Sequence, residues 1–275
     1  LSIQSAVSYG YVGNSAAVFA LQRMGHTVWP INTVVFSNHP EYGVHTGRVL
    51  PPSETRTLLD GLDMRGVLPR CNALLSGYLG DAGTGETVLH AAMRVRQGNT
   101  RALFALDPVI GDTRRGVYVR KGVPEFFRDE AVKAADIVLP NAFELAYLAG
   151  AEATTASAAL LAAKRLLLRG PRLVVVKGIH EEDRVVSLAV EAGQAWRVTT
   201  PRIDAPTQGA GDAFSAIFLG KFLEARDAAD ALSHAAAALF GILRATSGLG
   251  LDHLALIEAQ EQIVDPTQMF GAEPI

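Results

Sequence analysis

The sequence predicts an α/β fold with a parallel β-sheet flanked by helices. Short apolar runs typical of buried strands alternate with helical patterns through most of the chain, as expected for successive βαβ units. The 275 residues are 49% hydrophobic and 19% charged, which suits a globular protein with a sizeable core. No linker rich in proline, glycine or serine and no internal repeat interrupts the alternation. We therefore expect one domain over residues 1–275.

The first half of the chain contains the opening of a βαβ unit. In order, we expect a strand at residues 1–4, a helix at 14–24, a strand at 26–32, a helix at 54–65, a strand at 73–76, a helix at 85–96, a strand at 101–106 and a helix at 123–134. Gly25 ends the first helix and Ser53 caps the second. Residues 111–121 are polar and contain three arginines, a composition typical of a mobile flap over a site.

The second half continues the alternation and then becomes helical. In order, we expect a strand at residues 136–139, a helix that starts at 140–144, a helix at 157–168, a strand at 173–177, a hairpin with arms at 185–190 and 195–200, and helices at 211–224, 227–244 and 254–263. Asn141 and Glu144 have the spacing of a capping box, and Gly170 with Pro171 ends the helix before the valine-rich strand.

Charge and cysteine content exclude several classes of protein. The net charge is -3 and no basic block is present, so we expect no nucleic-acid partner. The single cysteine, Cys71, allows no intrachain disulfide and fits a reducing compartment. Residues 1–5 show no signal-peptide pattern, and the most apolar late stretch, 235–243, is too short to span a bilayer. We therefore expect a cytoplasmic protein with no membrane partner.

A glycine-rich turn at residues 207–216 leads directly into a helix. Gly209, Ala210 and Gly211 can present backbone N–H groups at a helix N-terminus, where a phosphate is favoured. Asp212 would compete with such an anion, unless it acts as a base that takes a proton from a substrate hydroxyl. The alternative is an ordinary loop and helix cap, because aspartate is a favoured capping residue.

Three further charged residues follow strands of the expected sheet. Asp107 comes after one strand, and Glu144 lies in the first turn of a helix after another, so both could hold Mg²⁺ near nucleotide phosphates. Lys177 ends an apolar strand and could reach a phosphate as a point charge. The plain alternatives are a turn aspartate, a cap glutamate and a solvated lysine.

Polar and aromatic side chains gather after the first two strands. Ser5 follows one of them, and the segment 33–43 follows the other, where loops line the ligand crevice of such sheets. His39 could bond a polar substrate, or could only satisfy its loop. Four aromatic residues of this region could stack on an aromatic substrate or simply pack, namely Tyr9, Tyr11, Phe36 and Tyr42.

The chain resembles the pyridoxal kinases of the ribokinase-like superfamily over nearly its whole length. Six segments carry the resemblance in the expected order: 3–5 with 9–14, 32–39, 77–80, 107–111, 140–144 and 209–212. The last segment is shared across the superfamily, whereas the first two are narrower and point to a vitamin B6 substrate. The resemblance implies a ribokinase-like fold, with a central mostly parallel β-sheet flanked by helices on both faces.

The resemblance also implies an activity and a set of site residues. The enzyme would transfer the γ-phosphoryl group of ATP to the 5′-hydroxyl of pyridoxal, using Mg²⁺ and with help from a monovalent cation such as K⁺, and it would be a homodimer. Asp212 would be the catalytic base, with Gly209, Ala210 and Gly211 as the anion hole. Ser5 and His39 would contact the vitamin. Residues on the ATP side would be Asp107, Leu139, Glu144, Lys177, Thr200, Pro201, Arg202 and Ile203, with Asp107 and Glu144 also serving the metal.

The chain departs from the family pattern at two places. After His39 many relatives have threonine, which contacts the substrate, whereas this chain has Pro40 followed by Glu41. A contact there would come from the backbone or from Glu41. Some bacterial relatives carry a cysteine in the flap. In this chain the corresponding part of the flap, which runs to Gly116 and Val117, contains no cysteine. The turnover of pyridoxal, or the preference among the B6 vitamers, could therefore differ.

Two alternative functions stay open from the sequence. One is a kinase for a related heterocyclic alcohol, such as hydroxymethylpyrimidine, which the segments around Ser5 and His39 disfavour. The other is a protein that binds or stores pyridoxal phosphate with weak catalysis, for which the departures at Pro40 and Val117 leave room.

Overall fold

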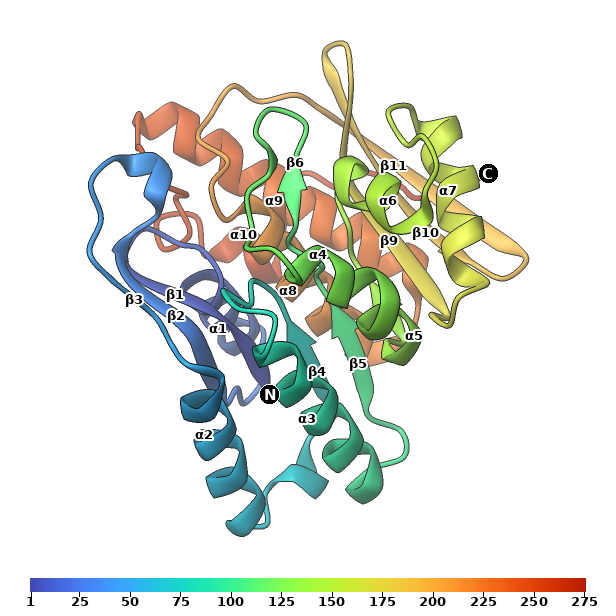
Figure 1. Ribbon diagram of the computed structural model, residues 1–275. Coiled ribbons are helices and arrows are strands. Elements are labelled where there is room, and N and C mark those ends of the chain that lie inside the picture. Colours follow the sequence, from blue (N-terminus) through green and yellow to red (C-terminus); the bar gives the residue numbers. More distant parts are fainter.

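A ten-stranded sheet runs through the computed structural model, which describes residues 1–275 (Figure 1). Across the sheet the strands are β12 (Glu273–Pro274), β11 (Gln194–Pro201), β10 (Arg184–Glu191), β9 (Leu173–Glu181), β8 (Ile137–Val138), β5 (Leu103–Leu106), β4 (Ala73–Ser76), β1 (Ser2–Tyr9), β2 (Pro30–Asn38) and β3 (Gly47–Val49). The strands from β9 to β2 pair in parallel, and the pairs outside them are antiparallel. The prediction of a mostly parallel central sheet is confirmed.

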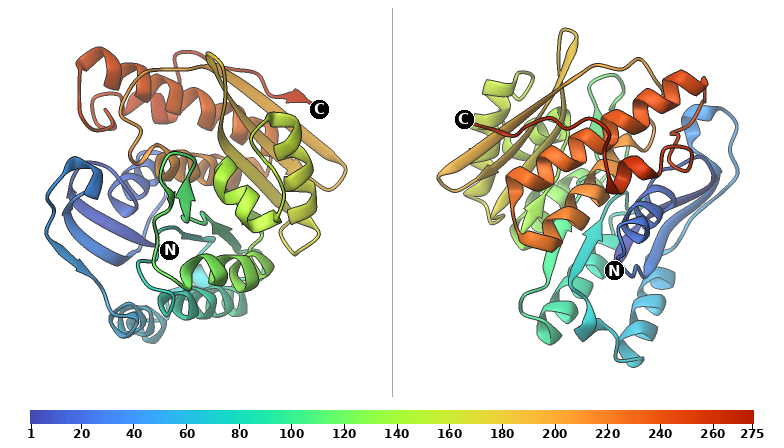
Figure 2. Two further views of the ribbon diagram at one scale, coloured as in Figure 1. Left: turned by 45° about the horizontal axis from the view of Figure 1, so that its top comes forward. Right: turned by 180° about the vertical axis from the view of Figure 1, so that it is seen from behind.

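Helices cover both faces of this sheet, because its strands are apolar on both sides. One face carries α1 (Asn14–Arg23), α8 (Ala210–Ala225), α9 (Ala228–Leu249) and α10 (Glu261–Val264). The other carries α2 (Pro52–Met64), α3 (Thr84–Gly98), α4 (Val123–Phe126), a π-helical turn (Phe127–Ala131), α5 (Val132–Ala134), α6 (Ala142–Ala149) and α7 (Ala156–Leu167). Figure 2 shows α9 and its neighbours from behind. Along β9, Val174 and Val176 enter one core while Leu173 and Val175 enter the other, which is the period-2 alternation of a strand buried on both faces.

Several predicted boundaries were wrong. The first strand continues from Ser2 to Tyr9, so Ser5 lies within β1 and not in a loop. The second begins at Pro30 and extends to Asn38. Both contain polar residues that suggest loops, but the two strands pair with each other on either side of an irregularity between Gln4 and Ala6. Lys177 likewise lies inside β9, which continues to Glu181 as one arm of a hairpin with β10.

Other differences concern helix ends and short elements. Helix α2 starts at Pro52 with Pro51 as its N-cap, so Ser53 is not the cap. The helix expected at 254–263 is mostly turns, and only α10 forms there. Short elements that the sequence did not predict are the strands β3 and β12 and the 3-10 turns η1 (Pro40–Tyr42) and η2 (Leu68–Arg70). The flap is a small hairpin of β6 (Gly111–Asp112) and β7 (Gly116–Val117).

The parallel strands end on the side of the sheet where α8 begins. Asp107 follows β5, and Asn141, which follows β8, pairs with Lys177 of β9 through an isolated bridge. The turn that starts α8 approaches the loop between β1 and α1, since α1 packs beside α8. None of the helices combines the length and the apolar character needed to cross a membrane.

Candidate active site

The turn into α8 brings its backbone against the loop after β1. Gly209 is the N-cap, with a left-handed φ of 83°, and a Cβ there would lie 1.6 Å from the carbonyl oxygen of Tyr11. Only glycine fits this position. Gly211 differs from the prediction, because its backbone is helical and a Cβ would meet only Lys177 Nζ, at 3.5 Å. The backbone therefore requires glycine at position 209, whereas a Cβ at position 211 would make only an ordinary contact with Lys177.

Asp212 lies in the first turn of α8 and does not cap the helix. The N-cap is Gly209, and no side-chain cap is formed, so the ordinary-cap alternative does not apply. Burial, and to a lesser extent the nearby carboxylate of Asp107, raise the pKa of Asp212 to about 6. A hydrogen bond from the Gly13 amide and the charge of Lys177 act in the opposite direction. A carboxylate with this pKa is well suited to accept a proton near neutral pH.

A buried cluster of three side chains lies beneath this turn. Lys177 Nζ is 2.7 Å from Asp107 Oδ2 and donates to Ser215 Oγ at 2.9 Å, and Ser215 in turn donates to Asp107 Oδ2 at 2.7 Å. Lys177 Nζ also lies 3.4 Å from the carbonyl oxygen of Gly211. The lysine is buried, which excludes the solvated alternative. Its charge therefore lies directly below the glycines of the turn.

Glu144 combines a structural role with an unusual charge state. The capping box is confirmed, because Asn141 Oδ1 accepts from the Glu144 amide and Glu144 Oε2 accepts from the Asn141 amide at 2.8 Å. Glu144 Oε1 accepts from the Ile110 amide at 3.1 Å. Burial, and then the Asp107 carboxylate, raise the pKa of Glu144 to about 8. Two buried carboxylates therefore lie close enough to repel each other.

This pair of carboxylates fits a cation that also binds phosphate. Mg²⁺ in nucleotide sites is held by one or two carboxylates together with phosphate oxygens and water. Asp107 and Glu144 supply that number. Lys177 already pairs with Asp107 at 2.7 Å, whereas Glu144 forms no ion pair, so a further cation would relieve the repulsion that Glu144 meets. No group of three or more histidine, cysteine, aspartate or glutamate residues forms a metal cage on its own. The residues present fit a metal held jointly with a nucleotide.

Ser5 lies next to a buried polar network inside the N-terminal βαβ unit, and its own side chain is not part of that network. Gly13, with φ of 54°, lies so close that a Cβ would be 2.5 Å from Ser5 Oγ. Beneath it, buried side chains bond to one another: Gln4 Nε2 to Ser2 Oγ at 2.9 Å, Ser2 Oγ to Asn14 Oδ1 at 2.7 Å, and Asn14 Nδ2 to Asn32 Oδ1 at 2.8 Å. Sequence reasoning missed this network, and the available signal was the polar side chains in otherwise apolar segments.

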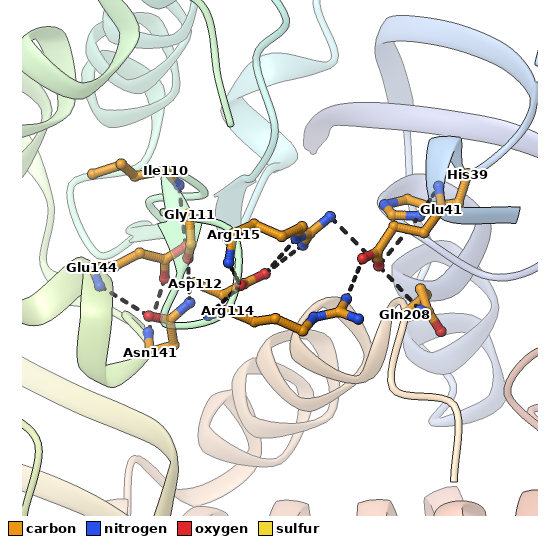
Figure 3. Close-up of polar contacts among 10 residues, drawn as sticks. All are labelled: His39, Glu41, Ile110, Gly111, Asp112, Arg114, Arg115, Asn141, Glu144 and Gln208. Atoms are coloured by element: carbon orange, nitrogen blue, oxygen red, sulfur yellow. Dashed lines mark hydrogen bonds and ion pairs between the residues drawn. The ribbon is translucent and has the colours of Figure 1, made fainter. Parts of the chain in front are cut away.

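The segment after β2 forms the turn η1 beside the flap. His39 is its N-cap, and its Nδ1 accepts from the Glu41 amide at 3.3 Å. Burial lowers the pKa of His39, which favours the neutral ring at pH 7. Pro40 is exposed at the first position of the turn. Glu41 does not stand alone but bonds to the flap and to Gln208 (Figure 3).

The flap lies over the carboxylates of the site. Its base is tied down by Asn141, whose Nδ2 donates to the carbonyl oxygen of Gly111 at 2.8 Å. Arg115 stacks on the ring of Tyr118 with 4.1 Å between guanidinium carbon and ring centroid. Partial burial, and then the charges of Glu144 and Asp212, raise the pKa of Tyr118, which is 38% exposed. The base of the flap therefore lies beside Asn141 and Glu144, at the edge of the site.

The predicted aromatic cluster forms in part. Tyr9 and Tyr42 meet edge to face with 6.0 Å between ring centroids, and Tyr11 lies 5.7 Å from the ring of His253. The hydroxyl of Tyr9 donates to Asp252 at 2.8 Å, so a loop after α9 joins the group. Phe36 is apart and packs on His45.

The remaining residues predicted for the nucleotide side lie near the ends of β8 and β11. Leu139 is fully buried and packs in the core. Thr200 and Pro201 end β11, and Ile203 follows them half-buried. Arg202 is exposed, and its amide donates to the carbonyl oxygen of Asp183 at 2.8 Å. Their nucleotide contacts stay predictions.

Comparisons with known proteins identify close relatives. A family model described as phosphomethylpyrimidine kinase matches residues 64–256. The pyridoxal kinase PdxY of Rubrobacter xylanophilus is 48% identical, over 98% of this chain and 95% of that relative. The pyridoxal kinase PdxY of Deinococcus radiodurans is 45% identical, over 100% of this chain and 96% of that relative. Among solved structures, the pyridoxal kinase of Leishmania donovani in complex with ADP and pyridoxine has a TM-score of 0.93 at 28% identity, covering 100% of this chain and 98% of that one.

Proposed function

The chain belongs to the pyridoxal kinases within the phosphomethylpyrimidine kinase family, and we propose that it transfers the γ-phosphoryl group of ATP to the 5′-hydroxyl of pyridoxal. The product is pyridoxal 5′-phosphate, as in vitamin B6 salvage. The observation that carries the proposal is Asp212, a carboxylate with a pKa of about 6 in the first turn of α8, directly after the Gly209 turn.

Residues of this chain can accept the proton of the attacking hydroxyl and stabilise the negative charge on the phosphoryl group. Asp212 accepts the proton of the attacking hydroxyl, which becomes a better nucleophile as the O–P bond forms. The amides of Gly209 and Gly211 at the helix N-terminus would donate to the oxygens of the phosphoryl group in transfer. The Ala210 amide, the third predicted donor, is bonded to the Thr207 carbonyl oxygen at 2.9 Å and would first have to leave it. Lys177, held 3.4 Å from the Gly211 carbonyl oxygen, adds a fixed positive charge below them.

The vitamin side and the nucleotide side then occupy opposite flanks of this turn. Ser5 would bond the pyridine ring, and His39 would lie beside it, with Pro40 and Glu41 following. On the nucleotide side, Leu139 and residues 200–203 would line the ATP pocket. The pyridoxal kinase of Leishmania donovani, solved in complex with ADP and pyridoxine and with ADP and pyridoxamine, supports these two ligand classes.

Asp107 and Glu144 would hold Mg²⁺ next to the phosphates of ATP. When bound, the ion would neutralise charge on the transferring phosphates. Burial of both carboxylates supports this assignment, because a cation relieves their repulsion. We propose K⁺ as an additional monovalent cofactor, and a single-domain homodimer in the cytoplasm as the working form.

The alternatives are not favoured. The narrow segments around Ser5 and His39 lie outside residues 64–256, the part matched by the phosphomethylpyrimidine kinase model. They lie inside the full-length matches to relatives named pyridoxal kinase. A storage protein with weak catalysis would not need a carboxylate with a pKa near 6 at the helix N-terminus.

The first experiment is ATP-dependent formation of pyridoxal 5′-phosphate by the purified protein with Mg²⁺ and K⁺ present. Wild-type protein should turn over pyridoxal, and Asp212→Asn should lower kcat by at least about 100-fold, as expected for a general base. Asp63→Asn is the matched control, since Asp63 bonds to Arg94 away from the site. Turnover near the wild-type level in Asp212→Asn would contradict the role of Asp212 as the general base.

A substrate panel tests the remaining functions. Hydroxymethylpyrimidine at the same ATP concentration should be a poorer acceptor than pyridoxal. A folded wild-type protein that binds pyridoxal phosphate but forms none from ATP and pyridoxal would instead support the storage function.

A further inference from the structure

The carboxylate of Glu41 is the centre of a polar cluster that joins three separate segments. One oxygen, Oε1, accepts from Arg114 of the flap. The other, Oε2, lies 3.5 Å from Arg115 of the flap and accepts from Gln208 Nε2 at 3.0 Å. Figure 3 shows the two arginines reaching from the flap toward Glu41, with Gln208 on the opposite side.

The three joined segments have different tasks in the site. Glu41 belongs to η1 after β2, on the vitamin side. The arginines belong to the flap, and Gln208 immediately precedes Gly209, the N-cap of α8. A single carboxylate therefore connects the wall of the acceptor pocket, the cover of the site and the turn of the anion hole.

The position of Glu41 is set by its own turn. Pro40 occupies the first position of η1, where its fixed φ favours the turn and its missing N–H costs no hydrogen bond. The Glu41 amide is used by His39 Nδ1. The carboxylate reaches the flap from this turn, while its Oε2 also lies 3.9 Å from His39 Nδ1.

The flap side of the cluster is also preorganised. Asp112 accepts from the backbone amides of Arg114 and Arg115 and from the Arg115 side chain. Arg115 further stacks on Tyr118. Both arginines are therefore presented at the tip of the hairpin, where Glu41 meets them.

From these contacts we propose that Glu41 is a positioning residue that latches the flap over the active site, and that its carboxylate does not act as a ligand of the vitamin. Glu41 acts through the flap arginines and through Gln208. The latch must release for substrates to enter and re-form to exclude water during transfer. The effect on kinase activity rests on the proposed function, whereas the latch itself does not.

The strength of the latch follows from its exposure. Arg114 is 72% exposed, whereas Glu41 is 20% exposed. Ion pairs of this kind are weak and screened by salt. The latch can therefore open without large cost, and its loss should change flap opening by several-fold and not by orders of magnitude.

Limited proteolysis tests the latch without using activity. Trypsin cleaves after arginine where the backbone can open locally, and the bonds after Arg114 and Arg115 should open more often when the flap leaves Glu41. Glu41→Gln should increase cleavage at these two bonds at least about threefold at low salt, measured by mass spectrometry of the fragments. High salt should increase cleavage of the wild-type flap in the same way.

The matched control is Glu54→Gln, which removes an ion pair with Arg48 at 3.1 Å that does not involve the flap. This variant should be cleaved in the flap at the wild-type rate. Equal cleavage of wild type, Glu41→Gln and Glu54→Gln would overturn the latch.

Kinetics separate a latch from a substrate ligand. In Glu41→Gln, ATP hydrolysis without vitamin should rise relative to phosphoryl transfer, and KM for pyridoxal should rise a few-fold while kcat stays within about twofold. A large rise in KM with unchanged flap cleavage and unchanged ATP hydrolysis would instead make Glu41 a substrate ligand. A wild-type protein without kinase activity but with the predicted cleavage pattern would overturn the proposed function and leave the latch standing.

Discussion

The floor and the cover of the active site are both built from a basic side chain paired with a carboxylate, but they differ in burial. In the floor, Lys177 and Asp107 are 2.7 Å apart, and their side chains are 9% and 3% exposed. In the cover, Arg114 pairs with Glu41, and the arginine is 72% exposed. The chemistry is the same, whereas the surrounding dielectric is not.

This difference decides what each pair can do. A charge left without its partner in the interior is strongly destabilising, so the floor is locked once the chain has folded. An exposed pair contributes at most about 1 kcal/mol, so the cover can open and close with small changes in salt or ligand. The catalytic groups are therefore held rigidly from below and enclosed reversibly from above.

The largest effect should come from breaking the floor pair. Lys177→Met leaves the Asp107 carboxylate buried without its counter-ion, and the free energy of unfolding should fall by about 3–5 kcal/mol. Chemical denaturation at neutral pH measures this. Arg114→Met in the cover is the matched change and should lower the free energy by no more than about 1 kcal/mol.

The double variant Lys177→Met with Asp107→Leu sharpens the same test. It removes both charges, so it should be more stable than Lys177→Met alone. If Lys177→Met and Arg114→Met lost the same free energy of unfolding, burial would not explain a difference in strength between the two ion pairs.

A smaller effect should come from the backbone of the floor. Gly209→Ala puts a Cβ into the space of the Tyr11 carbonyl oxygen and forces a left-handed φ, and should cost at least about 2 kcal/mol of stability. Gly211→Ala meets only Lys177 Nζ at 3.5 Å and has helical backbone. It should therefore unfold at the same temperature as the wild type, within about 1 kcal/mol of stability. Equal thermal stability of the two alanine variants would contradict this assignment.

The pH dependence should be similar to or smaller than the loss expected in Gly209→Ala. Burial raises the pKa of Asp212 from 3.8 to about 6, so kcat/KM should fall as pH drops through about 6 and level off above it. The folded protein holds a proton that the unfolded chain releases between these values, so stability declines as pH rises through this window.

Asp212→Asn isolates this contribution. At pH 7 it should be about 1–3 kcal/mol more stable than wild type, and the difference should vanish below pH 3.8. Denaturation curves of both proteins across pH measure it. A wild-type protein with the same pH dependence as the variant would show that Asp212 keeps an ordinary pKa.

The sequence predicted the fold class and most elements, because these depend on patterns within one segment. The alternation of apolar strands and helices, the capping box of Asn141 and Glu144 and the hairpin around 191–194 are all confirmed. The predicted lengths of β1 and β2 were too short. Their polar residues continue the strands because the backbone pairs with segments that are separated from them along the chain.

The residue types at the ends of the strands and at the start of α8 can be read from the local sequence. Their partners are fixed only when the chain folds. Lys177 reads equally well as solvated or buried until Asp107, 70 residues away, and Ser215, 38 residues away, are brought to it. Glu41 meets Arg114 across 73 residues of chain. Local sequence carries propensity, whereas burial and pairing of charges arise only when packing removes water and brings distant segments together.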